Sequence, residues 1–415
     1  MRLQLGRSLR LGSAVGAFGL ASTLGRARAQ SARDVQSAAT ASASEIGPVP
    51  SPDSNWTRHF AIEYGQYADS DHVFVETPSI RGTVSNPTAG WDFSGQYLVD
   101  VVSAASVDIV STASRRWQEV RQEGNVAASY KPKTFGVQAN GAVSDEPDYL
   151  SWSAGAAVTQ DLMDKDLTWL LGYGHGHDTA GRTGTPFSAF SRVLDRNAFN
   201  AVLSRVLNRT TVASLIGDVV LENGDPSKPY RYIPLFATGT AVRRGATIDQ
   251  VNNLRVSARP LEQLPLSRQR FALTARLAHR YHLATLRVDE RGYIDSWTMK
   301  ATTTDARLLF DLSPRVQFGP HARLHAQTGV NFWQRAYVLG PGYEYPALRT
   351  GDRELGPLFN ATGGFTLRIG LDHDPNPNAW VLGFDLNVTS TQYLDDLYVT
   401  QRISTVGGAT LETDL

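Results

Sequence analysis

The sequence lacks cysteine, a net charge and long apolar runs. The absence of cysteine is compatible with an oxidising compartment, because the chain carries no thiol to oxidise. Its 40 basic and 40 acidic side chains cancel, and without a basic surplus we expect no nucleic-acid partner. Beyond the first 30 residues no run of 18 apolar residues occurs, so no membrane-spanning helix is predicted. The 36 glycines and 20 prolines favour a β-rich chain with many turns, and such a chain would enter a membrane only as strands.

The first 29 residues are predicted to be a secretory signal peptide. Arginines at positions 2, 7 and 10 precede a modest apolar stretch at 11–24, and Ala27-Arg28-Ala29 forms a small-x-small cleavage site. An amphipathic N-terminal helix is the alternative interpretation. Residues 30–55 are rich in alanine and serine and hold almost no large apolar side chain, so we expect a flexible tether there.

From Trp56 onward, apolar and polar side chains alternate in segments of about ten residues. In the clearest segment, Val316 to Phe332, one set of alternate positions is apolar apart from Thr328, and the other is polar or glycine. A period of two places the two sets on opposite faces of one strand. The alternation recurs in residues 91–101, 135–143, 150–158, 363–371 and 380–388. Strands of about nine to eleven residues with one apolar face are typical of membrane-spanning barrels, whereas soluble strands usually have about five or six.

Two kinds of connection alternate along the chain. Short turns are predicted at residues 131–133, 164–166, 208–209, 281–282, 313–314 and 375–378. Longer or variable connections lie between them, at 103–114, 144–148, 177–195, 223–267, 291–295 and 333–360. This order places all long loops on one side of the sheet, as in barrels with short periplasmic turns and long external loops. We therefore predict an all-β, transmembrane, antiparallel up-and-down β-barrel of about sixteen strands over residues 56–415.

Two alternatives to this fold assignment stay open. Residues 187–207 fit a helical period in their first half and a strand period in their second, and we favour a loop to about Asp195 followed by a strand. A secreted, soluble β-sandwich would also show alternating segments. It gives no reason for the sorting of short and long connections, so the barrel is preferred.

Four stretches carry a resemblance to a known family. They are Val99–Ser106, Ser144–Ser151, Val206–Val212 and the loop Asp225–Ile233. They resemble an uncharacterised family of Gram-negative outer-membrane β-barrels, domain of unknown function 3570. The resemblance implies a barrel in the cell outer membrane but assigns no substrate and no functional residues. One departure is the C-terminus: such barrels generally end on an aromatic residue that resembles an assembly signal, whereas this chain ends on Leu415.

The polar face of the segment from Val316 is the candidate functional surface, because in a barrel it would line the lumen. The candidate lumen-lining residues are Arg315, Gln317, His321, Arg323, His325, Gln327, Arg368 and Asp385. Their basic members would favour the passage of anionic solutes, since pore selectivity follows the charge of the lining. The alternative is that these side chains pair with one another and with loops that enter the lumen.

The most ligand-like cluster is His175, His177 and Asp178, because histidines at i and i+2 share a face of a strand. A zinc site normally has three or four protein ligands, and no fourth partner is evident. Polar residues at the entry to an external loop are the preferred interpretation, so we predict no metal and no cofactor. No Gly-x-Ser-x-Gly nucleophile motif occurs, and we predict no enzymatic activity.

The sequence therefore favours an outer-membrane barrel, namely a porin-like channel or an export or uptake component for an unknown solute. The alternative function is a non-conducting barrel whose external loops bind a partner or a surface polymer. In either case the expected partners are outer-membrane lipid and the barrel assembly machinery.

Overall fold

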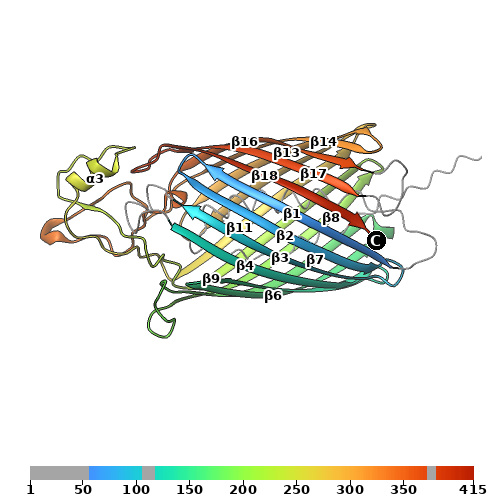
Figure 1. Ribbon diagram of the computed structural model, residues 1–415, viewed down its shortest axis with the longest axis horizontal. Coiled ribbons are helices and arrows are strands. Elements are labelled where there is room, and N and C mark those ends of the chain that lie inside the picture. The colour runs from blue at the N-terminus through green and yellow to red at the C-terminus, as the bar shows by residue number, and fades with distance from the viewer. Residues whose placement is uncertain (1–55, 105–116, 372–379) are drawn as a thin grey trace, which may run out of the picture.

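The computed structural model describes residues 56–104, 117–371 and 380–415, which form one closed antiparallel β-barrel (Figure 1). The predicted signal peptide at 1–29 and the tether at 30–55 lie outside these residues. Within the described residues, no helix is long and apolar enough to span a membrane.

The barrel strands follow one another around the ring in chain order. The first nine are β1 (Thr57–Asp69), β2 (Val73–Asn86), β3 (Trp91–Ala104), β4 (Trp117–Tyr130), β5 (Phe135–Glu146), β6 (Tyr149–Leu162), β7 (Leu167–Ala180), β8 (Arg192–Asn208) and β9 (Thr211–Gly224). The others are β11 (Ser267–Arg280), β12 (Ala284–Asp295), β13 (Lys300–Ser313), β14 (Val316–Gln327), β16 (Leu358–Gly370), β17 (Val381–Tyr393) and β18 (Gln401–Asp414). The first strand pairs with the last, with Ile62 opposite Leu411, and this pairing closes the barrel.

The predicted architecture is confirmed, because the described strands form a closed barrel of sixteen. The strands are longer than the apolar segments in the sequence suggest, at 12 to 17 residues each. They are longer because backbone pairing continues past the regular alternation. The regions 57–67, 72–80 and 396–415, where the sequence pattern is unclear, nevertheless contribute strands β1, β2 and β18.

The barrel reverses the usual distribution of side chains in a soluble protein. Large apolar residues cover the outside, and many are more than two-fifths exposed; Ile62, Ile80, Val126, Leu171, Leu273 and Leu324 are examples. Charged and polar residues occupy the buried inner face, among them Glu63, Asp100, Arg121, Arg196, Glu222 and Asn387. Period-two alternation produces this arrangement, because neighbours along a strand point to opposite sides of the barrel wall.

The long described connections all emerge at one end of the barrel, on the left in Figure 1. Short turns join the strands at the other end, at residues 87–90, 131–134, 163–166, 209–210, 281–283 and 314–315. Two predicted connections differ in the structure, because flanking strands extend into them: the one predicted at 144–148 is shorter, and the one predicted at 291–295 lies at 296–299. The β5–β6 hairpin has only residues 147–148 as its turn, and β12 runs through Asp295. The turn predicted at 375–378 lies outside the described residues.

Two further expectations about strand ends are corrected. The ambiguous segment 187–207 contributes a strand, as preferred, but β8 begins at Arg192 rather than at Asp195. The segment from Val316 does not continue to Phe332, because β14 ends at Gln327. After that residue Val330 and Trp333 enter an apolar cluster with Leu264, so tertiary packing overrides the alternation.

Three of the long connections fold together over the end of the barrel. We call residues 225–266, 328–357 and 394–400 the loop cap. Within the cap, β10 (Leu235–Phe236) pairs in parallel with β15 (Tyr337–Val338), and α3 (Ile248–Leu254) begins at a capping box between Thr247 and Gln250. The cap has apolar cores of its own, one of them formed by Phe236, Ala246, Val251 and Leu397.

Candidate functional site: the barrel interior and the loop cap

The inner face of β11–β14 is rich in arginine. Eight arginines point inward from these four strands: Arg268, Arg270, Arg276, Arg280, Arg287, Arg291, Arg307 and Arg323. The same face holds four aspartates, which are Asp289, Asp295, Asp305 and Asp311. Basic side chains therefore outnumber acidic ones on this part of the wall.

Five of these arginines lie on, or two residues from, the register row that joins Arg276, Asp289, Asp305 and Arg323. We call them the arginine belt: Arg276, Arg287, Arg291, Arg307 and Arg323. Three aspartates neutralise part of its charge, namely Asp218 on β9, Asp289 on β12 and Asp305 on β13. The belt keeps a surplus of positive charge. Of this group only Arg323 was expected from the sequence, although the even spacing of arginines within residues 267–280 and 287–291 was a signal for Arg276, Arg287 and Arg291.

Asp289 shows how the charges are shared. Arg276 donates to its two carboxylate oxygens at 2.9 and 2.8 Å, and Arg287 donates to the same oxygens at 3.2 and 2.9 Å. Two guanidinium groups thus hold one carboxylate, each in the two-pronged geometry that suits arginine and carboxylate. Farther along β12, Arg291 donates to Asp218 at 2.7 Å.

The wall opposite the arginine belt carries amides and carboxylates near its middle, and its carboxylates Asp100 and Glu123 both lie close to Arg121. In the ring, β3, β4 and β5 each lie eight strands away from β12, β13 and β14 respectively. Their inward faces hold Gln96, Asn125 and Asn140, which we call the amide belt. Asn125 donates to Gln96 at 3.4 Å, so these side chains interact across neighbouring strands.

Most of the candidate residues predicted on β14 lie on the inner face. His321 contacts Asn387 at 2.8 Å and Asp305 at 2.9 Å through its two ring nitrogens. Gln317 donates to Asp311 at 2.8 Å, and His325 contacts Thr303 at 2.7 Å. Gln327, at the end of the strand, instead donates to the carbonyl oxygens of Glu354 and Gly356 in the loop cap.

Arg323 differs from the other inward arginines. By register it lies opposite Asp305, but that carboxylate is engaged by His321 at 2.9 Å and by Arg307 at 3.2 Å. Among the residues that the structure describes, Arg323 has no hydrogen-bond or ion-pair partner. Its guanidinium is therefore the uncompensated charge of the arginine belt.

The remaining three candidates are dispersed. Arg315 lies in the short turn before β14 rather than on the wall. Arg368 forms an ion pair with Glu412, two strands away on β18. Asp385 is half-buried beside Gly408, and its Oδ2 atom has no hydrogen-bond partner among the described residues.

The histidine cluster is split between the two sides of the barrel wall. His175 and His177 point outward, where they lie against the Trp152 ring, and His177 contacts Asp195 at 2.7 Å. Asp178 points inward, is fully buried, and binds Ser151 and Arg196. Within the described ranges, no group of three or more histidine or acidic side chains is placed to hold a metal ion.

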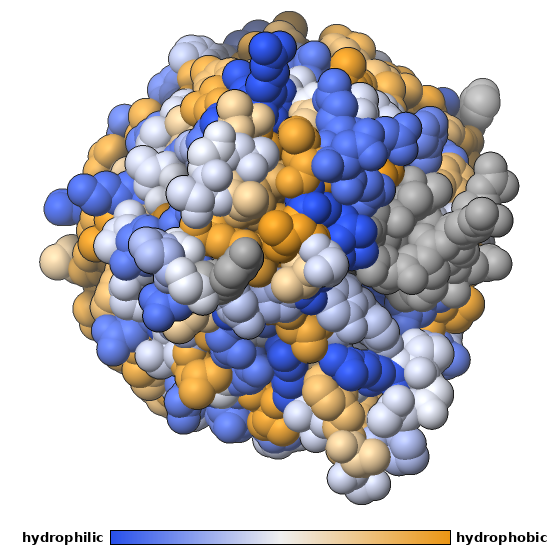
Figure 2. Space-filling model, turned by 90° about the vertical axis from the view of Figure 1, so that its left-hand side faces the viewer, coloured by the Kyte–Doolittle hydropathy of each residue, from blue (hydrophilic) through white to orange (hydrophobic). Residues whose placement is uncertain are grey.

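The loop cap covers the end of the barrel from which it emerges. Figure 2 looks onto this end, and side chains of mixed polarity fill the middle of the view. The cap is tied to the barrel rim by Glu354, which accepts from Tyr393 at 2.6 Å and lies 3.2 Å from Arg402. These contacts fix the cap over this end of the barrel.

Buried charges hold the cap together internally. Arg231 donates to Asp352 at 2.7 Å, while Lys228 lies 3.2 Å from the same carboxylate. Burial alone would raise the pKa of Asp352, but Arg231 and Lys228 hold that pKa below its usual range. Burial, with Arg231 nearby, lowers the pKa of Lys228, and Asp352 and Glu262 oppose this shift only in part.

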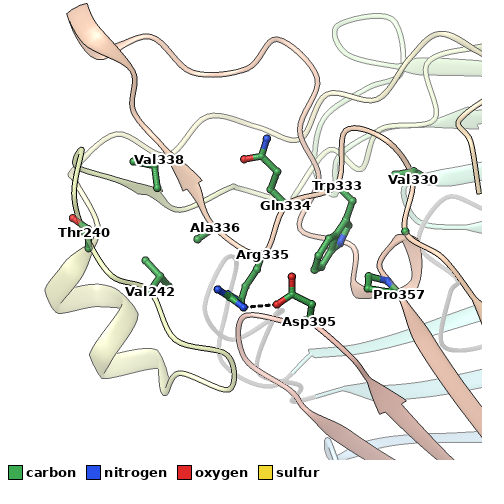
Figure 3. Close-up of a pocket in the computed structure, with 11 residues that line it drawn as sticks. Thr240, Val242, Val330, Trp333, Gln334, Arg335, Ala336, Val338, Pro357 and Asp395 are labelled. Carbon is green, nitrogen blue, oxygen red and sulfur yellow. Dashed lines mark hydrogen bonds and ion pairs between the residues drawn. The ribbon is translucent and has the colours of Figure 1, made fainter.

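The cap contains a pocket of about 540 Å³. Figure 3 shows its lining side chains arriving from three loops, with Arg335 and Asp395 joined as an ion pair. Trp333 forms part of the wall, and its ring nitrogen donates to the carbonyl of Asp352 at 3.2 Å. Val242, Val338 and Pro357 make the rest of the lining largely apolar.

Comparison with known proteins gives one family match and several likenesses of fold. A family model described as "Protein of unknown function (DUF3570)" matches residues 111–381, while no curated protein matches. CdiB from Acinetobacter baumannii is 10% identical over 86% of this chain, with a TM-score of 0.45, and the chain spans only 60% of its length. The outer membrane protein opdK of Pseudomonas aeruginosa is 6% identical over 87% of this chain and 99% of its own, with a TM-score of 0.41. OprD of Pseudomonas aeruginosa is 7% identical over 89% and 96%, with a TM-score of 0.42.

Proposed function

This chain belongs to the DUF3570 family, and we propose that it is an outer-membrane barrel that passes a small solute through its interior. The observation that carries the proposal is the reversed distribution of side chains, with an exposed apolar outer face and a buried, charged inner face. A soluble protein would gain nothing from so much exposed apolar surface, whereas a bilayer would cover it.

Closure of the barrel supports a membrane location. In hydrocarbon every backbone N–H and C=O group needs an internal partner, and only helices and closed barrels provide this. The pairing of β1 with β18 leaves no open edge in this ring. We therefore propose an outer-membrane location, with lipid and, during insertion, the barrel assembly machinery as partners.

The width of the barrel supports solute passage. Barrels of about eight strands are filled by their own side chains, whereas those of about sixteen to eighteen leave an aqueous channel. The inner wall here has sixteen strands and is lined by charged and amide side chains. Such a lining suits the passage of a hydrated polar solute, and we propose no catalytic role.

The loop cap acts in this proposal as a gate. Its ties to the barrel rim through Glu354, Tyr393 and Arg402 fix it over the mouth, so passage depends on movement of the cap or on gaps within it. We therefore expect low basal conductance with intermittent openings.

A second function is favoured by the pocket in the cap. Trp333 and the Arg335–Asp395 pair form a mixed polar and apolar recess of about 540 Å³ on an externally placed surface. A non-conducting barrel would use such a surface to bind a partner or a surface polymer.

Planar-bilayer recording separates the two functions. The purified, folded barrel is inserted into a bilayer, with heat-modifiable gel mobility and outer-membrane fractionation used to establish that it is folded and integral. Stepwise current through single molecules supports the channel. Folded protein that inserts without ever passing current contradicts it and leaves the binding function.

A further inference from the structure

We propose that the middle of the lumen is a selective site for oxyanion-bearing solutes, formed by the arginine belt and the amide belt, with Arg323 as its key residue. The inference rests on the proposed function, since it names the class of solute that the channel admits. It concerns carboxylate and phosphate groups, which share the chemistry that guanidinium groups recognise.

The positive charge of the arginine belt lies in the middle part of the barrel wall. Each arginine of the belt lies at least three residues from either end of its strand, so the surplus of charge lies away from both rims. The belt has five guanidinium groups against the carboxylates of Asp218, Asp289 and Asp305. An anion in the middle of the lumen therefore meets a net positive wall.

Arg323 differs from its neighbours in the arginine belt in having no acidic partner among the described residues. Arg276, Arg287, Arg291 and Arg307 each bind an aspartate, which lowers their attraction for a passing anion. Arg323 has no such partner among the described residues, because Asp305 is taken by His321 and Arg307. A solute oxyanion supplies the hydrogen-bond acceptors that its guanidinium lacks.

The amide belt lies on the wall opposite the arginine belt. Gln96, Asn125 and Asn140 are neutral, so they neither repel an anion nor compete with it for Arg323. Their amide groups can also donate hydrogen bonds to the polar parts of a solute held against the arginine belt. The carboxylates of the same wall, Asp100 and Glu123, lie beside Arg121, which offsets part of their charge. The surplus of positive charge on the arginine belt therefore favours organic acids or phosphorylated solutes over cations.

The test is a reversal potential measured across a bilayer with a KCl gradient at low ionic strength, where fixed charge is screened least. We expect chloride to permeate better than potassium in the wild type, and Arg323→Gln to reduce this preference severalfold. Arg323→Lys keeps the positive charge and should retain most of the preference for chloride. Arg209→Gln removes a positive charge from the β8–β9 turn, outside the lumen wall, and should change nothing. Replacing chloride by acetate or by phosphate then shows which oxyanion is preferred.

The outcomes separate this inference from the proposed function. A channel that prefers potassium, or one whose selectivity is unchanged in Arg323→Gln, overturns the oxyanion site and leaves the channel intact. A folded barrel that never conducts overturns the channel. In that case calorimetric titration of potassium phosphate and potassium acetate into the detergent-folded protein decides the site. A saturable binding heat in the wild type that is absent in Arg323→Gln supports the oxyanion site. The absence of any saturable heat in the wild type overturns the site.

Discussion

Arg353 of the loop cap reaches Asp71, in the turn between β1 and β2, and the two buried side chains form an ion pair with Nη2 2.5 Å from Oδ2. The two residues are 282 positions apart in the chain. This pair joins the cap to the part of the rim formed by the first hairpin. It therefore links the proposed gate directly to the barrel wall.

Removing Arg353 should release the cap. Breaking a buried pair by deleting one partner costs about 3–5 kcal/mol, because a buried charge is left alone. We expect Arg353→Gln to raise the open probability in bilayer recordings and to speed proteolysis within the cap, while the barrel stays folded. The double variant Arg353→Met with Asp71→Leu leaves no buried charge and should recover part of the wild-type behaviour. Equal open probability in the wild type and Arg353→Gln would show that this pair does not hold the gate.

The cap should also loosen in acid. Arg231 and Lys228 keep the pKa of Asp352 below its unfolded value of about 4. A carboxyl group with a depressed folded pKa stabilises the folded state above the unfolded pKa, and this contribution is lost as the pH falls towards the folded pKa. We therefore expect cap proteolysis to accelerate below about pH 4. Asp352→Asn should abolish that part of the pH dependence. If the acid sensitivity of Asp352→Asn is identical to that of the wild type, the pH dependence arises from other groups.

A charge on the outer face should be costly. Leu386, near the middle of β17, is 37% exposed and points away from the lumen. A lysine there would face hydrocarbon, at a cost of about 2–4 kcal/mol near the bilayer midplane. We expect Leu386→Lys to lower the free energy of unfolding in urea by an amount of this order, measured in lipid vesicles. Leu415→Lys, at the exposed C-terminus, serves as the control, and equal effects of the two changes would contradict a lipid-facing Leu386.

Neutralising Asp385 should stabilise the barrel. Its Oδ2 atom is buried without a hydrogen-bond partner among the described residues, and an unsatisfied buried polar atom costs about 1–3 kcal/mol, and more when it is charged. Asp385→Asn keeps the shape and removes the charge. We expect the urea concentration at the unfolding midpoint, measured by gel mobility, to be higher for Asp385→Asn than for the wild type. The open probability should be unchanged. A lower midpoint would mean that this carboxylate has a stabilising role.

The orientation of side chains was predictable from the sequence, because alternation in a strand has a fixed period of two. The odd-numbered residues from Gln317 to Gln327 lie on the inner face of β14, as that period requires. Arg315 was misplaced, because it falls in the turn, where the period no longer applies. His177 and Asp178 are separated by the same rule, since adjacent residues of a strand point to opposite sides.

The loop cap was not predictable in the same way. Residues 225–266 and 328–357 have no sustained period, and their structure depends on contacts between distant segments, such as Leu235 with Tyr337. The end of β14 at Gln327 likewise depends on Val330 and Trp333 packing against Leu264. Local patterns carry no information about such partners.

By itself, the sequence determined that alternate residues would form two unlike faces and that the long connections would share one end. Tertiary structure decided which charges are neutralised. Asp289 binds two arginines, Asp305 is taken by His321 and Arg307, and Arg323 is left without a partner among the described residues. These outcomes follow from the register between strands around the closed ring, which brings together side chains far apart in the sequence. Alternation specifies the face on which a residue lies, but only register specifies its neighbours on that face.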